Sequence, residues 1–209
     1  MRIDPAGWPF IGGATVLAII AAFAVHPLAG VAPVILAGCF VFFFRDPDRP
    51  ITQAAGTVLS PADGRVLVAG APTGDAPPGS WHQISIFLSP MDVHVNRMPV
   101  GGRVTKVRYH PGRFLPAYRP DAGDLNEYTE VWVDHGGQPI VVRQIVGILA
   151  RRIVCRTQEG AAVQAGDRFG MMKFGSRMDV FLPLSATIAV TVGERVVGGV
   201  TVIARLTES

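Results

Sequence analysis

The chain is poor in cysteine and lysine, and these shortages exclude several classes of protein. Its 209 residues include only two cysteines, Cys39 and Cys155, too few for a disulfide framework or a cysteine-rich zinc site. We therefore expect free thiols in a reducing compartment and no bound metal. Only two of the 19 basic residues are lysine, so the positive charge is carried by arginine, which makes bidentate contacts with phosphate and carboxylate groups. The net charge of +3 is too small for a dedicated nucleic-acid-binding protein, so no nucleic-acid partner is expected.

Coiled coils and long-helix proteins are excluded as well, because 24 glycines and 17 prolines interrupt the sequence. Hydrophobic residues make up 49% of the chain, and the mean hydropathy is +0.34. These values are wrong for a disordered chain and high for a purely soluble one. The excess of apolar residues must therefore be located along the chain.

The apolar excess is concentrated near the N-terminus, where no aspartate, glutamate, lysine or arginine occurs from Trp8 to Phe44. Pro27 divides this stretch into segments 8–25 and 28–44, each roughly 26 Å long as a helix. That length is slightly below the ~30 Å hydrocarbon core of a bilayer. The stretch lacks the basic start and cleavage site of a signal peptide and the polar face of an interfacial helix. It predicts a hairpin of two membrane helices, and a buried hairpin in a soluble protein is the alternative.

Arginines lie at both ends of this predicted hairpin, residues 1–44, and none lies at its turn. Arg2 is at one end, and Arg45 and Arg49 follow the other. Positively charged flanks stay on the cytoplasmic side of a membrane. We therefore expect a cell-membrane protein whose hairpin has both ends at the cytoplasmic face.

After the hairpin, the sequence changes to short apolar runs separated by glycine and proline. Runs of this length with alternating apolar residues are typical of β-strands. Residues 110–128 contain Pro111, Pro116 and Pro120 and are predicted to form a loop. The predicted strands are residues 64–69, 84–88, 104–109, 130–134, 140–146, 152–156, 178–182, 188–192 and 200–204.

Segments 160–166 and 193–199 share the pattern Gly-x-x-Val-x-x-Gly. We interpret each as a turn, one inward-facing apolar residue and a second turn. Such units recur in barrel-sandwich folds of the biotinyl/lipoyl kind, although ordinary hairpin turns give the same pattern. We therefore expect a mainly β catalytic domain over residues 45–209, of barrel-sandwich architecture, preceded by the helical hairpin.

Four polar clusters are candidates for a functional site, although each taken alone has a plainer interpretation as a turn or a structural group. Asp63 lies in a Ser-Pro-Ala-Asp-Gly turn. Residues 92–97 place Asp, His, Asn and Arg directly after an apolar strand, a position that suits a site. Asn126 and Glu127 follow the proline-rich loop. Ser176 lies between two apolar runs and does not match the Gly-x-Ser-x-Gly nucleophile elbow.

Taken together, these clusters resemble the short form of the phosphatidylserine decarboxylase proenzyme family. The resemblance runs in order from about Phe43 to Leu206, and its Phe-Gly-Ser-Arg block is distinctive. The matching segments are Phe43-Phe-Arg-Asp-Pro47, Ser60-Pro-Ala-Asp-Gly64, Ile86-Phe-Leu-Ser-Pro90, Asp92-Val-His-Val-Asn-Arg97, Asn126-Glu127, Ala150-Arg-Arg-Ile153, Arg168-Phe-Gly170 and Phe174-Gly-Ser-Arg177.

The resemblance implies that the chain cleaves itself between Gly175 and Ser176. The Ser176 hydroxyl would attack the Gly175 carbonyl, and elimination of the resulting ester would leave a dehydroalanine that hydrolyses to a pyruvoyl group. The products would be a large chain, 1–175, and a small chain, 176–209, that stay associated. The pyruvoyl cofactor would form a Schiff base with the substrate amine and accept electrons as CO₂ leaves.

The resemblance also assigns roles to two other residues. His94 is the candidate that delivers a proton after decarboxylation, and Asp63 matches a family position associated with orienting the processing residues. The long form of the family has His-x-x-His before Met-Pro, whereas Arg97 stands at the second histidine position here. Either His94 serves both steps, or Arg97 stabilises the oxyanion while another base acts.

The implied reaction converts phosphatidylserine to phosphatidylethanolamine and CO₂ in phospholipid biosynthesis, at a membrane surface. An archaetidyl lipid would leave the same pattern. A phosphodiester and a carboxylate need polar and cationic partners. The candidates are Arg97, Asn126, Glu127 and Arg177, with Arg113, Arg151 and Arg152 as further cations.

Three other functions stay open on the sequence. A membrane-tethered serine hydrolase could use Ser176, His94 and Asp63, and would remain one intact chain. A non-enzymatic lipoyl-like module would tolerate loss of Ser176. A pyruvoyl enzyme acting on a free amino acid would have no use for the hairpin.

Overall fold

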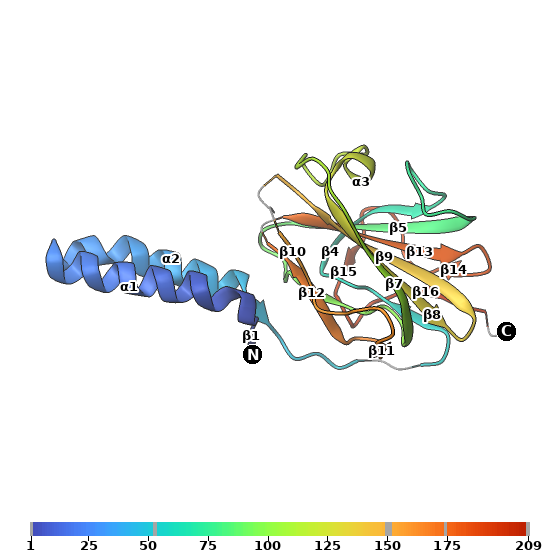
Figure 1. Cartoon of the computed structure of the whole chain (residues 1–209), viewed down its shortest axis with the longest axis horizontal. Coiled ribbons are helices and arrows are strands. Elements are labelled where there is room, and N and C mark those ends of the chain that lie inside the picture. Colours follow the sequence, from blue (N-terminus) through green and yellow to red (C-terminus); the bar gives the residue numbers. More distant parts are fainter. Residues whose placement is uncertain (1, 52–53, 149–151, 174, 208–209) are drawn as a thin grey trace. The chain divides into compact units, whose positions relative to one another are not determined.

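A computed structural model describes residues 2–51, 54–148, 152–173 and 175–207 (Figure 1). It divides into two compact units, Met1–Asp48 and Arg49–Ser209.

The first unit is a hairpin of two antiparallel helices, as predicted. Helix α1 spans Trp8–Ala24 and helix α2 spans Val31–Phe43. The short 3₁₀ helices η1, Pro5–Gly7, and η2, Pro27–Gly30, precede them. Strand β1, Arg2–Ile3, pairs with β2, Arg45–Asp46, and so joins the two ends of the hairpin.

The turn of the hairpin forms where the sequence predicts it. His26 is extended, and its Nδ1 accepts a hydrogen bond from the Leu28 N–H, 3.2 Å. Small residues let the helices approach closely, since a Cβ at Gly30 would lie 2.9 Å from the Ala22 Cβ. Ala14 and Ala18 are buried.

The outward surface of the hairpin is apolar. Phe23 is 89% exposed, and Ile35 is 63% exposed. Soluble monomers rarely expose large contiguous apolar patches. Residues Pro5–Ala24 are long and apolar enough to cross a bilayer, and Pro27–Phe43 is a shorter apolar helix. The hairpin is therefore suited to anchor the chain in a membrane.

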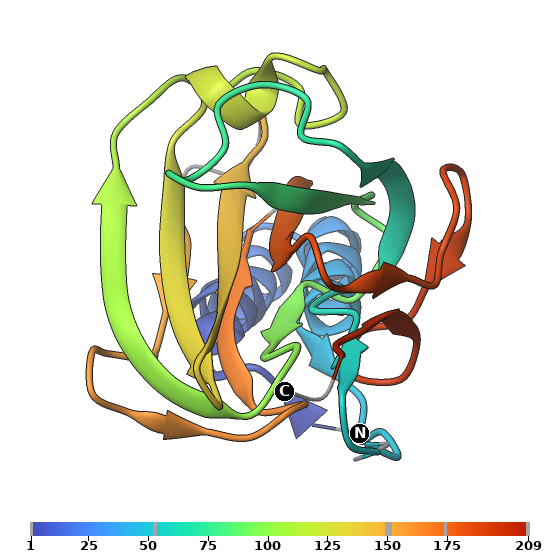
Figure 2. The same cartoon turned by 90° about the vertical axis from the view of Figure 1, so that its right-hand side faces the viewer.

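The second unit is mainly β, as predicted, and its described strands form three antiparallel sheets. Figure 2 shows the long, curved strands β7, β8 and β9 of the largest sheet side by side. In spatial order, that sheet comprises β11 (Ala162–Val163), β7 (Gly102–His110), β8 (Tyr128–His135), β9 (Gln138–Val146), β13 (Ser176–Pro183), β5 (Trp81–Leu88), β4 (Gly64–Gly70) and β15 (Arg195–Val196). The second comprises β10 (Ile153–Cys155), β12 (Arg168–Met172) and β6 (Val95–Arg97), and the third β14 (Thr187–Ile188), β16 (Val202–Arg205) and β3 (Thr57–Leu59).

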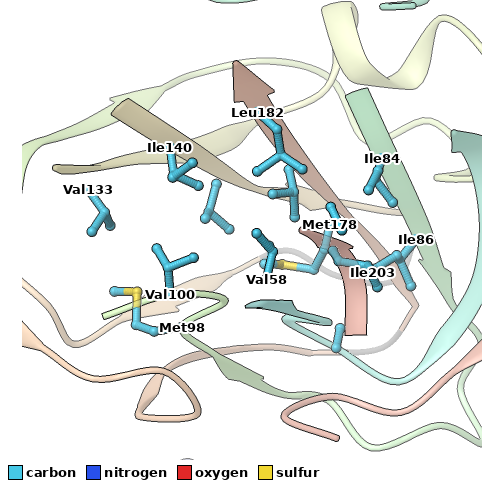
Figure 3. Close-up of a cluster of buried hydrophobic side chains, with 14 of the residues drawn as sticks. Val58, Ile84, Ile86, Met98, Val100, Val133, Ile140, Met178, Leu182 and Ile203 are labelled. Carbon is cyan, nitrogen blue, oxygen red and sulfur yellow. The ribbon is translucent and has the colours of Figure 1, made fainter. Parts of the chain in front are cut away.

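The core lies against the inner face of the largest sheet (Figure 3). Successive strand residues point to opposite faces, so alternate residues of β5 and β13 enter it. Ile84 and Ile86 come from β5, and Met178 and Leu182 come from β13; all four are fully buried. Ile203 of β16 is fully buried in the same cluster. The alternation visible in the sequence is therefore the alternation of the core.

Each predicted strand overlaps an observed one, but the strand predicted at 188–192 overlaps β14 only at Ile188. The 110–128 loop contains one short helix, α3, Ala122–Leu125. The two Gly-x-x-Val-x-x-Gly segments supply β11 and β15, which lie at opposite edges of the largest sheet. Edge strands this short offer little backbone for unwanted pairing. Within the described residues no sheet closes on itself, so barrel-sandwich architecture stays a prediction.

Candidate functional site

Ser176 is the first residue of β13 and lies in the interior of the second unit. It is paired with Leu88 of β5 on one side and with Val146 of β9 on the other. Its side chain is fully buried, and its Oγ has no hydrogen-bond partner among the described residues. A buried hydroxyl without a partner is costly, so its presence here indicates a chemical role.

The peptide before Ser176 contacts His94. Gly175 has a φ of +76°, a conformation that favours glycine, and its N–H donates to His94 Nε2 at 3.2 Å. The other ring nitrogen, Nδ1, lies 2.9 Å from the Asp92 carbonyl oxygen. These partners assign the proton to Nδ1 and leave Nε2 as the acceptor. His94 therefore presents a basic nitrogen to the Gly175-Ser176 segment.

Gly147, which directly follows β9, lies against the carbonyl of Gly175. A Cβ at Gly147 would lie 2.4 Å from the Gly175 oxygen and 3.2 Å from its carbonyl carbon. No side chain fits at that distance. The carbonyl that Ser176 would attack is therefore held by a position that requires glycine.

Asp92 fixes the turn that carries His94. Its carboxylate accepts hydrogen bonds from the N–H and the hydroxyl of Ser89, at 2.9 and 2.8 Å. The exposed Arg195 donates to the other carboxylate oxygen at 2.6 Å. Because Arg195 belongs to the 176–209 segment, this ion pair links it to the residues before position 175.

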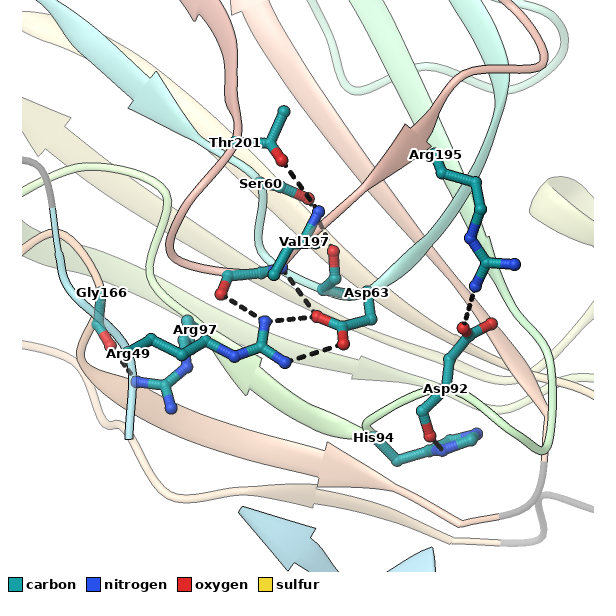
Figure 4. Close-up of polar contacts among 12 residues, drawn as sticks. Arg49, Ser60, Asp63, Asp92, His94, Arg97, Gly166, Arg195, Val197 and Thr201 are labelled. Carbon is teal, nitrogen blue, oxygen red and sulfur yellow. Dashed lines mark hydrogen bonds and ion pairs between the residues drawn. The ribbon is translucent and has the colours of Figure 1, made fainter. Parts of the chain in front are cut away.

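Asp63 belongs to a different polar cluster (Figure 4). Its carboxylate accepts two hydrogen bonds from Arg49, one of them 2.7 Å long, and one of 2.8 Å from the Gly198 N–H. Figure 4 shows Asp63 directed toward Arg49, with His94 lying apart. The role of Asp63 in orienting the processing residues stays a prediction. Its observed contacts join residue 49 to the turn around residue 198.

Arg97 and Arg177 are both buried, on different sides of the site. Arg97 Nη1 donates to the Gly166 carbonyl at 3.1 Å. Arg177 lies on the face of β13 opposite to Ser176, since adjacent strand residues alternate. Its Nε and Nη2 donate to the Asp179 carboxylate at 2.6 and 2.9 Å. The part of either arginine in substrate binding stays a prediction.

The Arg177–Asp179 ion pair continues into neighbouring strands. Arg177 Nη2 also donates to Ser85 Oγ at 2.9 Å, and Gln83 donates to the Asp179 carboxylate at 3.0 Å. The side chains of Arg177 and Asp179 are only 2% and 1% exposed. A Cβ at Gly123, in α3, would lie 3.3 Å from Arg177 Nη2. Helix α3 therefore covers this ion pair and excludes water from it.

Asn126 and Glu127 hold the 111–127 loop against the strand end beside Ser176. Asn126 Nδ2 donates to the Leu115 and Val146 carbonyls, both at 2.8 Å, and its Oδ1 accepts from the Leu115 N–H at 2.8 Å. The Glu127 side chain hydrogen-bonds Tyr109, which raises the pKa of that phenol. Their part in substrate binding stays a prediction.

The three further arginine candidates are not buried in the site as Arg97 and Arg177 are, or lie outside the described residues. Arg113 and Arg152 are exposed, and Arg151 lies outside the described residues, as does Phe174 of the Phe-Gly-Ser-Arg block. Within the described ranges no group of three or more His, Cys, Asp or Glu side chains is placed to hold a metal.

Two further polar residues lie near the site: Asn96, which belongs to the predicted 92–97 cluster but had no role assigned, and Gln144, which was not predicted. Both are fully buried, and Gln144 Nε2 donates to Asn96 Oδ1 at 2.8 Å. The sequence held a signal for Gln144, because Ile140 and Val142 alternate into the core and Gln144 takes the next inward position. Gly147 had no such signal, since a glycine after a strand is common.

The arrangement is that of a buried serine–histidine site directed at its own backbone. The serine hydroxyl follows a glycine peptide whose N–H donates to the imidazole of His94. Such a site holds a serine hydroxyl, a backbone carbonyl and an imidazole in one part of the second unit.

Comparison with known proteins gives the family of the chain. Residues 36–204 match the family model for phosphatidylserine decarboxylase. A phosphatidylserine decarboxylase proenzyme of Symbiobacterium thermophilum is 45% identical over 202 residues, covering 96% of this chain and 94% of the relative. Proteins of the same name from Granulibacter bethesdensis and Pelodictyon phaeoclathratiforme are 42% and 41% identical, over 97% and 90% of this chain and 85% and 92% of their own lengths. The chain belongs to the phosphatidylserine decarboxylase family.

Proposed function

We propose that this chain is a self-processing decarboxylase that converts phosphatidylserine to phosphatidylethanolamine and CO₂. Family membership supports the reaction. The observation that carries the self-processing step is the Gly175-Ser176 segment, in which the buried Ser176 Oγ has no partner among the described residues and the half-buried Gly175 donates its N–H to His94 Nε2.

This geometry supports the following processing step. His94 Nε2 would accept the hydroxyl proton as Ser176 Oγ bonds to the Gly175 carbonyl carbon, and would return it to the Ser176 nitrogen as the carbon–nitrogen bond breaks, which leaves an ester. Elimination would then transfer the Cα proton of residue 176 to a base as the Cβ–Oγ bond breaks, and would release the large chain with a carboxylate at Gly175. Addition of water and loss of ammonia convert the resulting dehydroalanine at position 176 to a pyruvoyl group.

The residues around position 176 fit a pyruvoyl group. The position is fully buried between β5 and β9, and its neighbours Leu88 and Val146 are apolar and buried. A pyruvoyl group supplies a carbonyl that binds an amine and withdraws electrons during decarboxylation. The chain's own part is to exclude water there and to hold a proton on His94 Nε2, next to the reacting residue.

The two products would stay together. Strand β13 lies between β5 and β9 and is paired with both. The ion pair between Asp92 and Arg195 joins the two products, whereas the ion pair between Arg143 and Glu130 lies within the large chain. The heterodimer of chains 1–175 and 176–209 would therefore be held by sheet pairing, core packing and that ion pair. The turns at residues 160–166 and 193–199 are also compatible with the barrel-sandwich architecture.

The hairpin would place this activity at the cytoplasmic face of the cell membrane. Its outward surface is apolar, and Arg2 and Arg45 lie at its ends. A variant with Ile19→Asp and Ile35→Asp, both on that surface, should move from the membrane fraction to the soluble fraction. Retention of the double variant in the membrane would contradict a membrane hairpin.

The intact mass of the purified protein tests the function. The wild-type chain should give two species, the smaller beginning at residue 176 and carrying a borohydride-reducible carbonyl, and should decarboxylate phosphatidylserine vesicles. Ser176→Ala should give one uncleaved species without activity, and Ser185→Ala, which changes an exposed serine, should behave as wild type. A single wild-type species that reacts with a fluorophosphonate would indicate a serine hydrolase instead. Full function of Ser176→Ala would indicate a binding module.

A further inference from the structure

The strongest unexplained feature of the second unit is a buried pair of amide side chains, Asn96 and Gln144. Neither is exposed, and one hydrogen bond joins them, from Gln144 Nε2 to Asn96 Oδ1. Asn96 Nδ2 and Gln144 Oε1 have no hydrogen-bond partner among the described residues. Buried polar atoms are almost always paired. This pair therefore offers one free donor and one free acceptor in an interior where both are costly.

The amide pair fits because the neighbouring strand β12 is irregular and has a glycine beside it. Strand β12 has a register irregularity between Arg168 and Gly170, and Gly170 is the residue opposite Asn96. A Cβ at Gly170 would lie 2.5 Å from Gln144 Nε2. Position 170 must therefore be glycine for the Gln144 amide to occupy its place.

The pair faces residue 176. Gln144 is opposite Met178, two residues along β9 from Val146, which is opposite Ser176. Side chains two residues apart share a face, so Gln144 and Ser176 lie on the same inner face as diagonal neighbours, roughly 7–8 Å apart. The Ser176 Oγ on that face is likewise without a partner in the described structure.

His94 links the amide pair to the peptide before residue 176. His94 and Asn96 are two residues apart on one extended segment and so share a face, and His94 Nε2 accepts from the Gly175 N–H. Asn96 then reaches Gln144, whose strand borders β13. His94 therefore contacts the peptide before residue 176, and Gln144 lies on the inner face that residue 176 shares.

A free donor next to a free acceptor, both neutral, matches the two ends of an α-amino carboxylate. A carboxylate accepts hydrogen bonds, and an amine or ammonium donates them. Gln144 Nε2 also donates to the Val154 carbonyl at 3.4 Å, which sets the orientation of the Gln144 amide and, through their shared hydrogen bond, that of Asn96. The absence of charge from the pair also suits a carboxylate that must be lost, because a buried arginine would stabilise the charged reactant.

We propose that Asn96 and Gln144 bind the serine headgroup of the substrate beside residue 176, with the Asn96 amide donating to its carboxylate and the Gln144 carbonyl accepting from its amine. This proposal rests on the proposed function and adds a headgroup site to it. It also gives the site a basis for distinguishing a serine headgroup from the ethanolamine headgroup of the product, which has no carboxylate.

The test replaces both amides with apolar side chains of similar shape, Asn96→Leu with Gln144→Met. Removing both partners of a buried hydrogen bond is close to neutral for stability, so the double variant should fold and cleave itself as wild type does. Thr157→Val is the matched control, because Thr157 Oγ1 is also buried without a partner in the described residues but lies outside the site.

The readout is trapping of lipid amines on the small chain with cyanoborohydride, measured as a mass increase. Phosphatidylserine and phosphatidylethanolamine are compared in detergent micelles. The double variant should trap the serine lipid about tenfold to a hundredfold less than wild type, the range for loss of a hydrogen bond to a charged group. It should trap the ethanolamine lipid within a few-fold of wild type, and Thr157→Val should match wild type for both.

Equal trapping of the serine lipid by wild type and double variant would overturn the headgroup site. Failure of the double variant to cleave itself, at an unchanged Tm, would also overturn it by assigning the amides to processing. If the double variant does not fold, Asn96→Asp decides the question, because a carboxylate there should repel the serine lipid and leave ethanolamine trapping intact. Failure of the wild-type chain to cleave or to trap either lipid would instead refute the proposed function.

Discussion

Replacing Gly147 with alanine should slow self-cleavage while leaving the fold in place. The added Cβ would lie 2.4 Å from the Gly175 carbonyl oxygen, where real contacts are at least 3.0 Å, so the oxygen must move by about 0.6 Å or more. The next neighbour, the Ala117 Cβ at 3.4 Å, is an ordinary contact. The displacement therefore falls mainly on the carbonyl that Ser176 would attack in the proposed processing step.

The size of the effect follows from the sensitivity of reactions to alignment. A misplacement of 1 Å costs about a hundredfold in rate, so a shift of this size should slow cleavage by roughly tenfold to a hundredfold. The assay is a time course of intact mass after synthesis of the chain, with Tm measured on the same samples. Gly101→Ala is the matched control, because its Cβ meets nothing closer than 3.4 Å and its φ is not positive.

Cleavage of Gly147→Ala at the wild-type rate would refute the reasoning. It would mean that the carbonyl tolerates a displacement, or that the attack occurs from a geometry other than the one described. If Gly147→Ala cleaves slowly and its Tm is also clearly below that of wild type, the glycine maintains the fold and not the alignment.

Other predictions concern buried groups away from the scissile peptide. Arg177→Met leaves the Asp179 carboxylate buried without its cation and should lower the free energy of unfolding by about 3–5 kcal/mol, measured by urea titration. The double variant Arg177→Met with Asp179→Leu should recover most of that loss. An equal loss in the single and double variants would contradict the buried-charge explanation. Burial raises the pKa of the Cys155 thiol, so less thiolate is present at neutral pH. In a Cys39→Ser background, alkylation of Cys155 should be slow at pH 7 and should accelerate only at pH values above those at which an ordinary thiol reacts. The pH profile of an ordinary thiol would contradict the effect of burial on Cys155.

Much of the architecture could be predicted because its cause is local. A stretch of apolar residues divided by Pro27 defines the hairpin wherever the rest of the chain lies. The long strands are visible in their alternation, which reflects burial of one face. Short strands such as β6 and β12 were missed, because two to five residues carry little pattern and their formation depends on pairing with each other.

The site could be predicted only through resemblance, because its contacts join distant parts of the chain. His94 and Gly175 are 81 residues apart and are brought together by sheet pairing. Nothing local to Asp63 indicates that Arg49 will bind its carboxylate. The amide pair illustrates the same limit, since 48 residues separate Asn96 from Gln144.

The position of β13 between β5 and β9 would make the proposed cut before Ser176 hard to reverse once the protein unfolds. Before cleavage, the chain delivers β13 to the gap between β5 and β9 as one connected polymer. After cleavage, a 34-residue fragment would have to find that gap from solution, at the entropic cost of a second molecule. Mature protein unfolded in urea should therefore refold far less completely than the uncleaved Ser176→Ala chain. The cleaved protein would then stay native because unfolding is slow, since the covalent link that placed β13 during folding is no longer present.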